Sequence, residues 1–454
     1  MHTSAAHPSA SPSLMNGNHE FMRRSLAAVW HPCTQMKSHE RVPLVPIRRG
    51  EGAWLEDFDG RRYLDAISSW WVNLFGHCNP RINAALQDQL ARIEHLMLAG
   101  FTHEPVVQLS ERLAALTGGT LGHCFYASDG ASATEIALKM SVHYWRNSGR
   151  PGKDGFLAIE DGYHGETLGA LSVTDVPLFR EAYATLLRPA HTLPSPDWRR
   201  AQPGERAQDF ALRQAGALEA HLERHHARTA ALIVEPLVQC AAGMAMHHPA
   251  WLRRARELCD RFEVHLIADE IAVGCGRTGT FFAHEQAHIR PDFLCLSKGI
   301  SGGYLPLSTV LTTDRVYEAF YSDDSARAFL HSHSYTGNAL ACRAALATLD
   351  IFEQDDVLAA NRARAASLSA ACAALRAHPR VRHFRQCGMI LAFDVADAPA
   401  GFARRYAQEA MARGILLRPI ADCVYFMPPY VVDDDQIALL AKAAFAALDA
   451  TLEG

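Results

Sequence analysis

The chain has 454 residues, of which 49% are hydrophobic and 20% charged, enough for two or three globular domains. Its formal net charge of −5 gives no basic footprint for nucleic acid, and no apolar run approaches the about 18 residues that a membrane span requires. Eleven cysteines without a C-x-x-C pair argue against a zinc ribbon or a disulfide framework, and they predict reduced thiols in the cytoplasm.

The N-terminal stretch, residues 1–19, is rich in Ser, Ala, Pro and Asn and lacks the apolar region of a secretory signal. We expect a disordered tail there. Next, Trp54-Leu55 and Tyr63–Asp65 flank the turn at 57–60, which predicts a hairpin with a longer loop. The following SSWW segment, residues 68–71, places two aromatic rings beside small residues in a loop. They can form core or an apolar wall for a ligand.

A possible anion site follows two segments with helical spacing, 81–93 and 105–116. The sequence FYASDGASATE, residues 125–135, runs from a strand into a helix through small residues, and Ser132 and Glu135 have the spacing of a capping box. Backbone N–H groups at a helix start bind anions, so Gly130 and Ala131 can cradle a phosphate. Many strand–helix turns look alike, so this signal alone is weak.

Strands alternate with helices through the middle of the chain. Phe156–Ile159 reads as a buried strand that ends near Tyr163, which either lies flat over a planar ring or packs on its own loop. Ala231–Val234 is a further strand, and a helix starting at Pro249 leads into the strand Val264–Ala268. This alternation predicts parallel βαβ units and therefore an α/β, doubly wound sheet.

Two strands deliver an acid and an amine to the same edge of this sheet. Val264–Ala268 is followed by Asp269, and Phe293–Leu296 is followed closely by Lys298. Ligands bind at the carboxyl ends of parallel strands, so the pair predicts a Schiff-base cofactor site. Only five residues are lysines among 44 Lys and Arg, which makes an ordinary surface lysine here less expected. Glu270 permits a paired-carboxylate or metal site, but adjacent strand residues face opposite ways.

Two histidines and the C-terminal part of the chain give weaker indications of a site. His221 and His225 have metal-ligand spacing, but a solvated helix face is favoured, and we expect no metal site. Residues 338–454 mix helices with short strands at Met389–Asp394 and Val424–Met427. Arg418 stands among apolar residues there. It is either part of a structural salt bridge or a clamp for a substrate carboxylate.

The chemistry of a Schiff-base cofactor assigns a role to each of these features. Lys298 supplies the amine and then the base for a proton shift, and Asp269 holds a pyridine nitrogen protonated. Gly130 and Ala131 cradle a phosphate. Tyr163 stacks on the ring.

With these residues, the chain resembles the pyridoxal-phosphate-dependent class III aminotransferases of fold type I over nearly its full length after the tail. The motifs LIADEIAVGCGRTG, LSKG, SDGASATE, GYHGET and HSYTGN carry the resemblance. It implies an α/β large domain, with a mainly parallel sheet flanked by helices, and a smaller α+β domain. We expect the large domain over residues 68–337 and the small domain over 20–67 and 338–454.

The resemblance also implies the site and the assembly. The cofactor is pyridoxal 5′-phosphate, and the catalytic residues are Lys298, Asp269 and Tyr163. Cofactor contacts come from Gly130, Ala131, Tyr163, Asp269, Lys298, His333 and Ser334. Substrate contacts come from Trp70, Tyr163, Lys298, Ser332, Arg418 and Tyr425. The protein is expected to be a homodimer with shared sites, in which Ser334 reaches the partner's cofactor phosphate.

Three further segments, WHPCTQ, SSWW and RPIADCVYFMPPY, resemble one branch of the class. Its members aminate 8-amino-7-oxononanoate with S-adenosylmethionine, or in related enzymes lysine, as amino donor. An ω-amino acid:pyruvate aminotransferase is the alternative, and it would lack the last two segments. The chain departs from the branch at Cys33, where tyrosine is common, at Ala131, where serine is common, and at His333-Ser334 in place of Pro-Thr.

Overall fold

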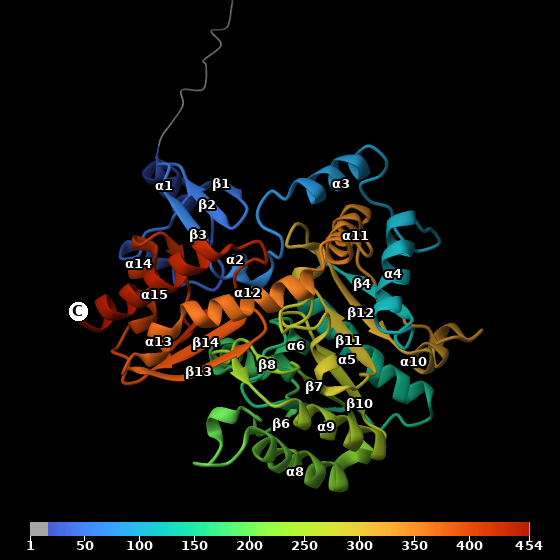
Figure 1. The fold of residues 1–454 in the computed structure, drawn as a ribbon. Coiled ribbons are helices and arrows are strands. Elements are labelled where there is room, and N and C mark those ends of the chain that lie inside the picture. The colour runs from blue at the N-terminus through green and yellow to red at the C-terminus, as the bar shows by residue number, and fades with distance from the viewer. Residues whose placement is uncertain (1–16, 454) are drawn as a thin grey trace, which may run out of the picture.

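The computed structural model describes residues 17–453, and its centre is a seven-stranded sheet in the order β4–β12–β11–β10–β7–β5–β6 (Figure 1). The strands are β4 (His123–Ala127), β5 (Gly155–Ile159), β6 (His191–Leu193), β7 (Thr229–Val234), β10 (His265–Asp269), β11 (Phe293–Leu296) and β12 (Ser308–Thr312). Only the pairs made by β12 are antiparallel. The predicted mainly parallel sheet is confirmed, and β12 is the reversed strand within it.

Helices cover both faces of this sheet. Ile233 of β7 packs in one apolar cluster with residues of α5 (Gly130–Asn147). Its neighbour Leu232 packs in a second cluster with residues of α8 (Ala207–His225) and α9 (Pro249–Arg261). Successive strand residues point to opposite faces, and here both faces are buried. That double burial explains why these strands are continuous apolar runs in the sequence.

A four-stranded sheet joins the beginning of the described chain to its end. It runs β1 (Ile47–Glu51), β2 (Trp54–Asp57), β3 (Arg62–Asp65) and β15 (Ile415–Leu416). The β2–β3 pair is the predicted hairpin, and β3 pairs with β15 in parallel. Figure 1 accordingly shows the blue β1–β3 beside the red C-terminal helices. Because β3 and β15 are parallel, the segments that follow them leave the same edge of the sheet.

The remaining elements surround these two sheets. A three-stranded antiparallel sheet contains β13 (Val381–Cys387), β14 (Ile390–Val395) and β16 (Cys423–Phe426), and a two-stranded sheet contains β8 (Val238–Gln239) and β9 (Ala245–Met246). The other helices are α1 (Asn18–Ala28), α2 (Ser68–Trp71), α3 (Pro80–Leu90), α4 (Glu104–Leu116), α6 (Leu168–Val173), α7 (Pro177–Arg180), α10 (Asp314–Glu318), α11 (Ala339–Gln354), α12 (Val357–Ala371), α13 (Ala373–Ala377), α14 (Phe402–Ala412) and α15 (Asp434–Glu453).

The described residues begin within the predicted tail. Residues 1–16 of the tail lie outside the described residues, and α1 begins at Asn18, before the predicted tail ends. The domain limits at 67/68 and 337/338 stay predictions. Within residues 17–453, no helix has the length and apolar character to cross a membrane.

Candidate active site

Asp269 and Lys298 line one cavity of about 310 Å³ at the carboxyl edge of the central sheet. Asp269 is the last residue of β10, and Lys298 opens the short helical segment after β11, the parallel neighbour of β10. The cavity is lined by Trp71, Asp129, Gly130, Ala131, Tyr163, His164, Gly165, Glu166, Glu235, Asp269, Ile271, Ala272 and Lys298. The sheet therefore brings together five of the predicted residues: Gly130, Ala131, Tyr163, Asp269 and Lys298.

Lys298 is held in an unusual backbone conformation with its amine inside the protein. Its φ is +46°, in the left-handed region that side-chain-bearing residues seldom adopt. Its Nζ lies 5.2 Å from the centre of the Trp71 ring. Burial lowers the pKa of the Lys298 amine, while the charge of Asp269 opposes this shift. A lysine with a lowered pKa is a better nucleophile and base than a solvated lysine.

The Asp269 carboxylate is buried and oriented by two partners. One oxygen lies 2.7 Å from Nδ1 of His164, and the other accepts the N–H of Ile271 at 3.1 Å. The second ring nitrogen of His164 is enclosed without a partner among the described residues. A buried carboxylate is costly unless it meets a positive group. A protonated ring nitrogen bound in the cavity would be such a group.

The start of α5 offers a cradle of backbone N–H groups. Gly130 and Ala131 occupy its first turn, where no preceding carbonyl is available to their N–H groups. A Cβ on Gly165, whose φ is +117°, would lie 2.5 Å from the Cβ of Ala131, so glycine keeps this cradle open. The predicted capping box is wrong. Asp129 caps the helix through the N–H of Ser132, and Glu135 instead accepts from Thr167 and Gly169.

Tyr163 lines the cavity and is fixed at both ends. Its hydroxyl donates to Glu166 at 2.9 Å, and its N–H donates to Glu235 at 3.1 Å. Burial first, and then the bond to Glu166, raise the pKa of the Tyr163 hydroxyl, so it is held as a neutral donor. Burial also raises the pKa of the Glu235 carboxyl to about 7. Glu235 had no predicted role, although it directly follows β7, the strand beside the one that Asp269 ends.

The backbone of the SSWW segment, helix α2, has an unusual conformation. All four residues of α2 have positive φ, between 45° and 74°, and the N–H groups of Trp71 and Val72 bond to the carbonyls of Ile67 and Ser68. The segment is thus one turn of left-handed helix, which costs about 1–2 kcal/mol per residue for L-amino acids. Backbone strain of this kind is concentrated at functional sites.

Trp71, rather than the predicted Trp70, lines the cavity with Lys298. Trp70 is 41% exposed, and the guanidinium carbon of Arg418 lies 4.3 Å from its ring centre. Arg418 also donates to the carbonyl of Cys33 at 3.4 Å. Tyr425 is buried behind Trp71, whose indole N–H donates to its hydroxyl at 3.2 Å. Trp70 and Arg418 therefore form an exposed pair beside the cavity, and Tyr425 supports its wall.

The predicted residues Ser332, His333 and Ser334 do not line the cavity of their own chain. Ser332 and Ser334 are exposed, and the carbonyl of Ser334 lies 2.7 Å from Nε2 of His95. His333 bonds only within its own loop, where its Nδ1 accepts the N–H of Tyr335. Their predicted role in a partner's site stays a prediction.

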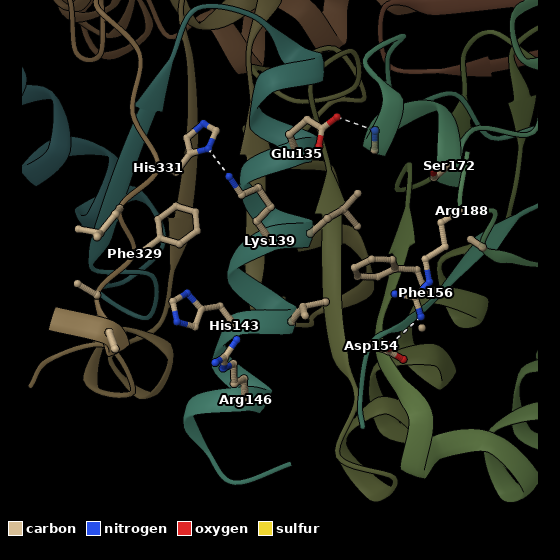
Figure 2. A pocket seen from close by; sticks show the side chains of 18 of the residues that line it. Glu135, Lys139, His143, Arg146, Asp154, Phe156, Ser172, Arg188, Phe329 and His331 are labelled. Carbon is tan, nitrogen blue, oxygen red and sulfur yellow. Dashed lines mark hydrogen bonds and ion pairs between the residues drawn. The ribbon is translucent and has the colours of Figure 1, made fainter. Parts of the chain in front are cut away.

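A larger cavity, of about 740 Å³, lies on the outer side of α5 (Figure 2). Figure 2 shows Lys139, His143 and Arg146 along the helix, with Phe329 and His331 on one side and Phe156 and Arg188 on the other. This larger cavity is lined by none of the predicted site residues. Lys139 is exposed and bonded to His331 at 2.8 Å. We place the active site in the smaller cavity because that one holds the buried lysine and carboxylate.

Eight of the thirteen lining residues were absent from the predicted site, among them Trp71, His164 and Glu235. His164 lies in the GYHGET motif, and Trp71 is next to the predicted tryptophan, so the right segments were identified. The choice within each segment depended on side-chain direction. Glu235 could have been identified from the sequence, because it directly follows a predicted strand.

Comparison with known proteins identifies the class. The family model "Aminotransferase class-III" matches residues 35–448, and the chain belongs to this family. Its aminotransferases depend on pyridoxal 5′-phosphate, and a Pseudomonas amine transaminase with 32% identity and a TM-score of 0.88 was solved with this cofactor bound. The buried carboxylate, the lysine and the free N–H groups of α5 fit this group.

The chain is 43% identical to the adenosylmethionine-8-amino-7-oxononanoate aminotransferase of Helicobacter pylori, over 97% of this chain and 100% of that protein. The solved enzyme of the same name from Methanocaldococcus jannaschii has 32% identity and a TM-score of 0.89, covering 95% of this chain and 99% of its own. An ω-transaminase from Thermomicrobium roseum has 30% identity and a TM-score of 0.91, covering 96% and 100%.

Proposed function

We propose that this aminotransferase converts 8-amino-7-oxononanoate to 7,8-diaminononanoate in biotin biosynthesis, with S-adenosylmethionine as amino donor. The names of its relatives from Helicobacter pylori and Geobacter sulfurreducens, the latter 39% identical over 91% of this chain, support the proposal. The observation in this molecule that carries it is the pair Trp70–Arg418 beside the catalytic cavity.

Arg418 is suited to bind the carboxylate of a long oxo acid. It forms no ion pair with any residue in the part of the chain that the structure describes, and it lies over the exposed Trp70 ring. A guanidinium without a carboxylate partner can donate hydrogen bonds to a substrate carboxylate. The next residue in the chain, Trp71, lies against the amine of Lys298, and its apolar surface suits the substrate's hydrocarbon chain.

The chain's residues divide the chemistry among themselves. When bound, pyridoxal 5′-phosphate supplies a carbonyl that takes up the amino group and a ring that withdraws electrons. Lys298 would hold the cofactor covalently through its amine, and once released this amine would act as the base that moves the proton. Asp269 holds a proton on the ring nitrogen, and His164 orients Asp269. The N–H groups of Gly130 and Ala131 bind the phosphate.

The environment of Lys298 favours its role as a base. Burial lowers the pKa of its amine, so more of it is unprotonated near neutral pH than for a solvated lysine. Tyr163, with its raised pKa, remains a donor over the same range and faces the same cavity. It stacks on the cofactor ring and contacts substrate.

The assembly is a cytoplasmic homodimer in which each chain completes its partner's site. In support, Ser332 and Ser334 are exposed next to Leu330, which is 81% exposed, and Tyr335, which is 62% exposed. Apolar side chains exposed in one loop are typical of interfaces. His333 and Ser334 from this loop contact the partner's cofactor phosphate, and Ser332 contacts its substrate. Leu330 and His331 of the same loop line the larger cavity on α5 (Figure 2), and we propose that the second copy covers it.

Mixing two inactive variants tests this sharing. A Lys298→Ala chain and a Ser334→Asp chain are each inactive alone, but a mixed dimer contains one site with both native residues. Random mixing restores about a quarter of the wild-type activity, because half of the dimers are mixed and each has one intact site. Absence of any recovery in verified mixed dimers contradicts shared sites.

An ω-amino acid:pyruvate aminotransferase is the second candidate, because the Thermomicrobium roseum ω-transaminase matches the fold as well as the Methanocaldococcus enzyme does. The deciding experiment incubates the purified holoenzyme with 8-amino-7-oxononanoate and either S-adenosylmethionine or lysine, and measures diaminononanoate. In parallel, pyruvate is offered with an ω-amino acid. Diaminononanoate formation supports the proposal. Turnover of pyruvate alone supports the second candidate.

A further inference from the structure

A buried carboxylate, Asp65, fastens the left-handed turn α2. Asp65 is fully buried at the end of β3. Its Oδ1 accepts the N–H of Ser69 at 3.0 Å and that of Ile67 at 3.4 Å. Its Oδ2 accepts the hydroxyl of Ser69 at 2.8 Å. Three donors in and before the turn therefore converge on one carboxylate, and removing it would leave them without acceptors inside the protein.

His77 holds this carboxylate from the other side. Its Nε2 lies 3.0 Å from Oδ2 of Asp65. The backbone of His77 is itself fixed by two hydrogen bonds to Gly52, at 2.7 and 3.1 Å, next to the β1–β2 connection. Since Asp65 ends the third strand of that same sheet, the carboxylate is clamped between the sheet and the turn.

The turn determines where the two tryptophans lie. The Nζ of Lys298 lies 5.2 Å from the centre of the Trp71 ring, and the guanidinium carbon of Arg418 lies 4.3 Å from the centre of the Trp70 ring. Neighbouring residues of a helical turn point in different directions, so one turn serves both ends of the substrate. The parallel pair β3–β15 also brings the segment of Arg418 close to the turn, because Asp65 is opposite Leu416, two residues before Arg418.

We propose that Asp65, with His77 as its partner, is a positioning residue for transamination that acts through the left-handed turn. Neither side chain lines the catalytic cavity. Asp65 keeps Trp71 against Lys298 and keeps Trp70 available to Arg418. The kinetic part of the inference rests on the proposed function, because it uses the oxo acid as substrate. The spectroscopic part does not, because it is read without substrate.

Asp65→Ala tests the kinetic part, with Asp57→Ala as the matched control. Asp57 is also buried, also ends a strand of the hairpin, and also accepts backbone N–H groups, but it lies at the hairpin's other end. Asp65→Ala lowers kcat/KM for the oxo acid on the order of 100-fold, as expected when a site is displaced by about 1 Å. Asp57→Ala leaves the kcat/KM of folded enzyme near the wild-type value. Equal losses in the two variants overturn the inference.

Conservative variants separate positioning from general destabilisation. Asp65→Asn keeps an oxygen for the N–H of Ser69, so its loss is smaller, roughly tenfold. His77→Gln keeps a nitrogen donor near the position of Nε2 and retains most of the activity that His77→Ala loses. If His77→Gln and His77→Ala are equally impaired, the contact to Asp65 is not what positions the turn.

A double-mutant cycle with Trp71→Phe shows whether Asp65 acts through the turn. If it does, Asp65→Ala costs little further activity in the Trp71→Phe background, because the contact between residue 71 and Lys298 that Asp65 maintains is already altered there. Tryptophan emission of the holoenzyme is recorded without substrate on the same four proteins. Asp65→Ala changes the part of the emission that depends on Trp71. Additive kinetics together with unchanged Trp71 emission overturn the inference, even if the oxo acid proves to be the wrong substrate.

Discussion

At the scale of single residues, the environment of each charged group decides what it can do. Lys298 is enclosed beside Trp71 with Asp269 nearby, and burial lowers its pKa. Arg418 is exposed and stacked on Trp70, and it has no carboxylate partner among residues 17–453. The reactive amine and the cation that we propose binds the substrate carboxylate are thereby kept apart.

Lys298→Ala abolishes turnover and the visible absorption of the lysine-bound cofactor. Lys298 is the only lysine among the described residues that line the cavity, so no other amine can replace it. Absorbance spectra of the purified protein and single-turnover assays provide the measurement. Lys442→Ala, at an exposed position of α15, is the control and keeps both signals. Full activity of Lys298→Ala without added amine contradicts the assignment.

Arg418→Ala lowers kcat/KM for 8-amino-7-oxononanoate roughly tenfold or more, the effect of losing a hydrogen-bonded charge partner of about 1.5–3 kcal/mol. The loss is limited because Arg418 is exposed, where water screens the pair. The half-reaction with the amino donor falls less. Arg418→Lys, which keeps the charge but loses the planar fork, is intermediate. Equal losses in both half-reactions would mean that Arg418 binds both substrates. No change in either would make it structural.

At the scale of elements, strand and helix ends place the chemistry. β10 ends at Asp269, Lys298 stands two residues after β11, α5 begins at the proposed phosphate cradle, and β3 and β15 end a few residues before Trp70 and Arg418. Each pair of parallel strands delivers its following residues to one edge. The catalytic groups therefore come from rigid elements, while the short turns after them set their direction.

Gly165→Ala weakens cofactor binding at least roughly tenfold, because the added Cβ would lie 2.5 Å from that of Ala131 at the start of α5. Its φ of +117° adds backbone strain. Titration of the apoprotein with pyridoxal 5′-phosphate, followed by absorbance, gives the affinity. Gly149→Ala is the matched control: it has φ of +77° just after α5, with open space around it. If both variants bind equally well, the cradle does not depend on Gly165.

At the scale of the whole molecule, the cores on both faces of the sheet bury several histidines. His265 of β10 is fully buried against Tyr144 and Trp145, with its Nδ1 2.9 Å from the hydroxyl of Ser141. Burial lowers the pKa of His265 to about 3. The unfolded chain therefore binds a proton below about pH 6.5 that the folded chain refuses, and the free energy of unfolding decreases as pH falls from about 6.5 toward 3.

His265→Asn removes this part of the acid sensitivity. Between pH 7.5 and pH 5 the wild-type protein loses about 2 kcal/mol more unfolding free energy than the variant does. Asparagine retains a polar group for Ser141, and the exposed His288→Asn is the control. Denaturant unfolding at fixed protein and cofactor concentrations measures the difference. An identical pH dependence in wild type and His265→Asn would show that His265 is protonated in the folded state.

Much of the site could be predicted because the relevant signals are local. A buried strand followed by a carboxylate or a lysine is visible in the sequence, and parallel pairing then places Asp269 and Lys298 at one edge. The spacing of apolar residues predicted the helix α9, and turn residues predicted the hairpin of β2 and β3. The capping box at Ser132 failed because a better N-cap, Asp129, stands three residues earlier.

The sequence alone determined the class of chemistry, the central sheet and the segments that form the site. Only the tertiary structure decided which side chain of each segment faces the cavity: Trp71 instead of Trp70, with His164 and Glu235 added. The reason is that these directions depend on a left-handed turn of four residues that are not glycine. Local preference does not predict that turn because, besides the bonds to Asp65, it is held by contacts to Tyr425 and Met427, which are distant in the chain.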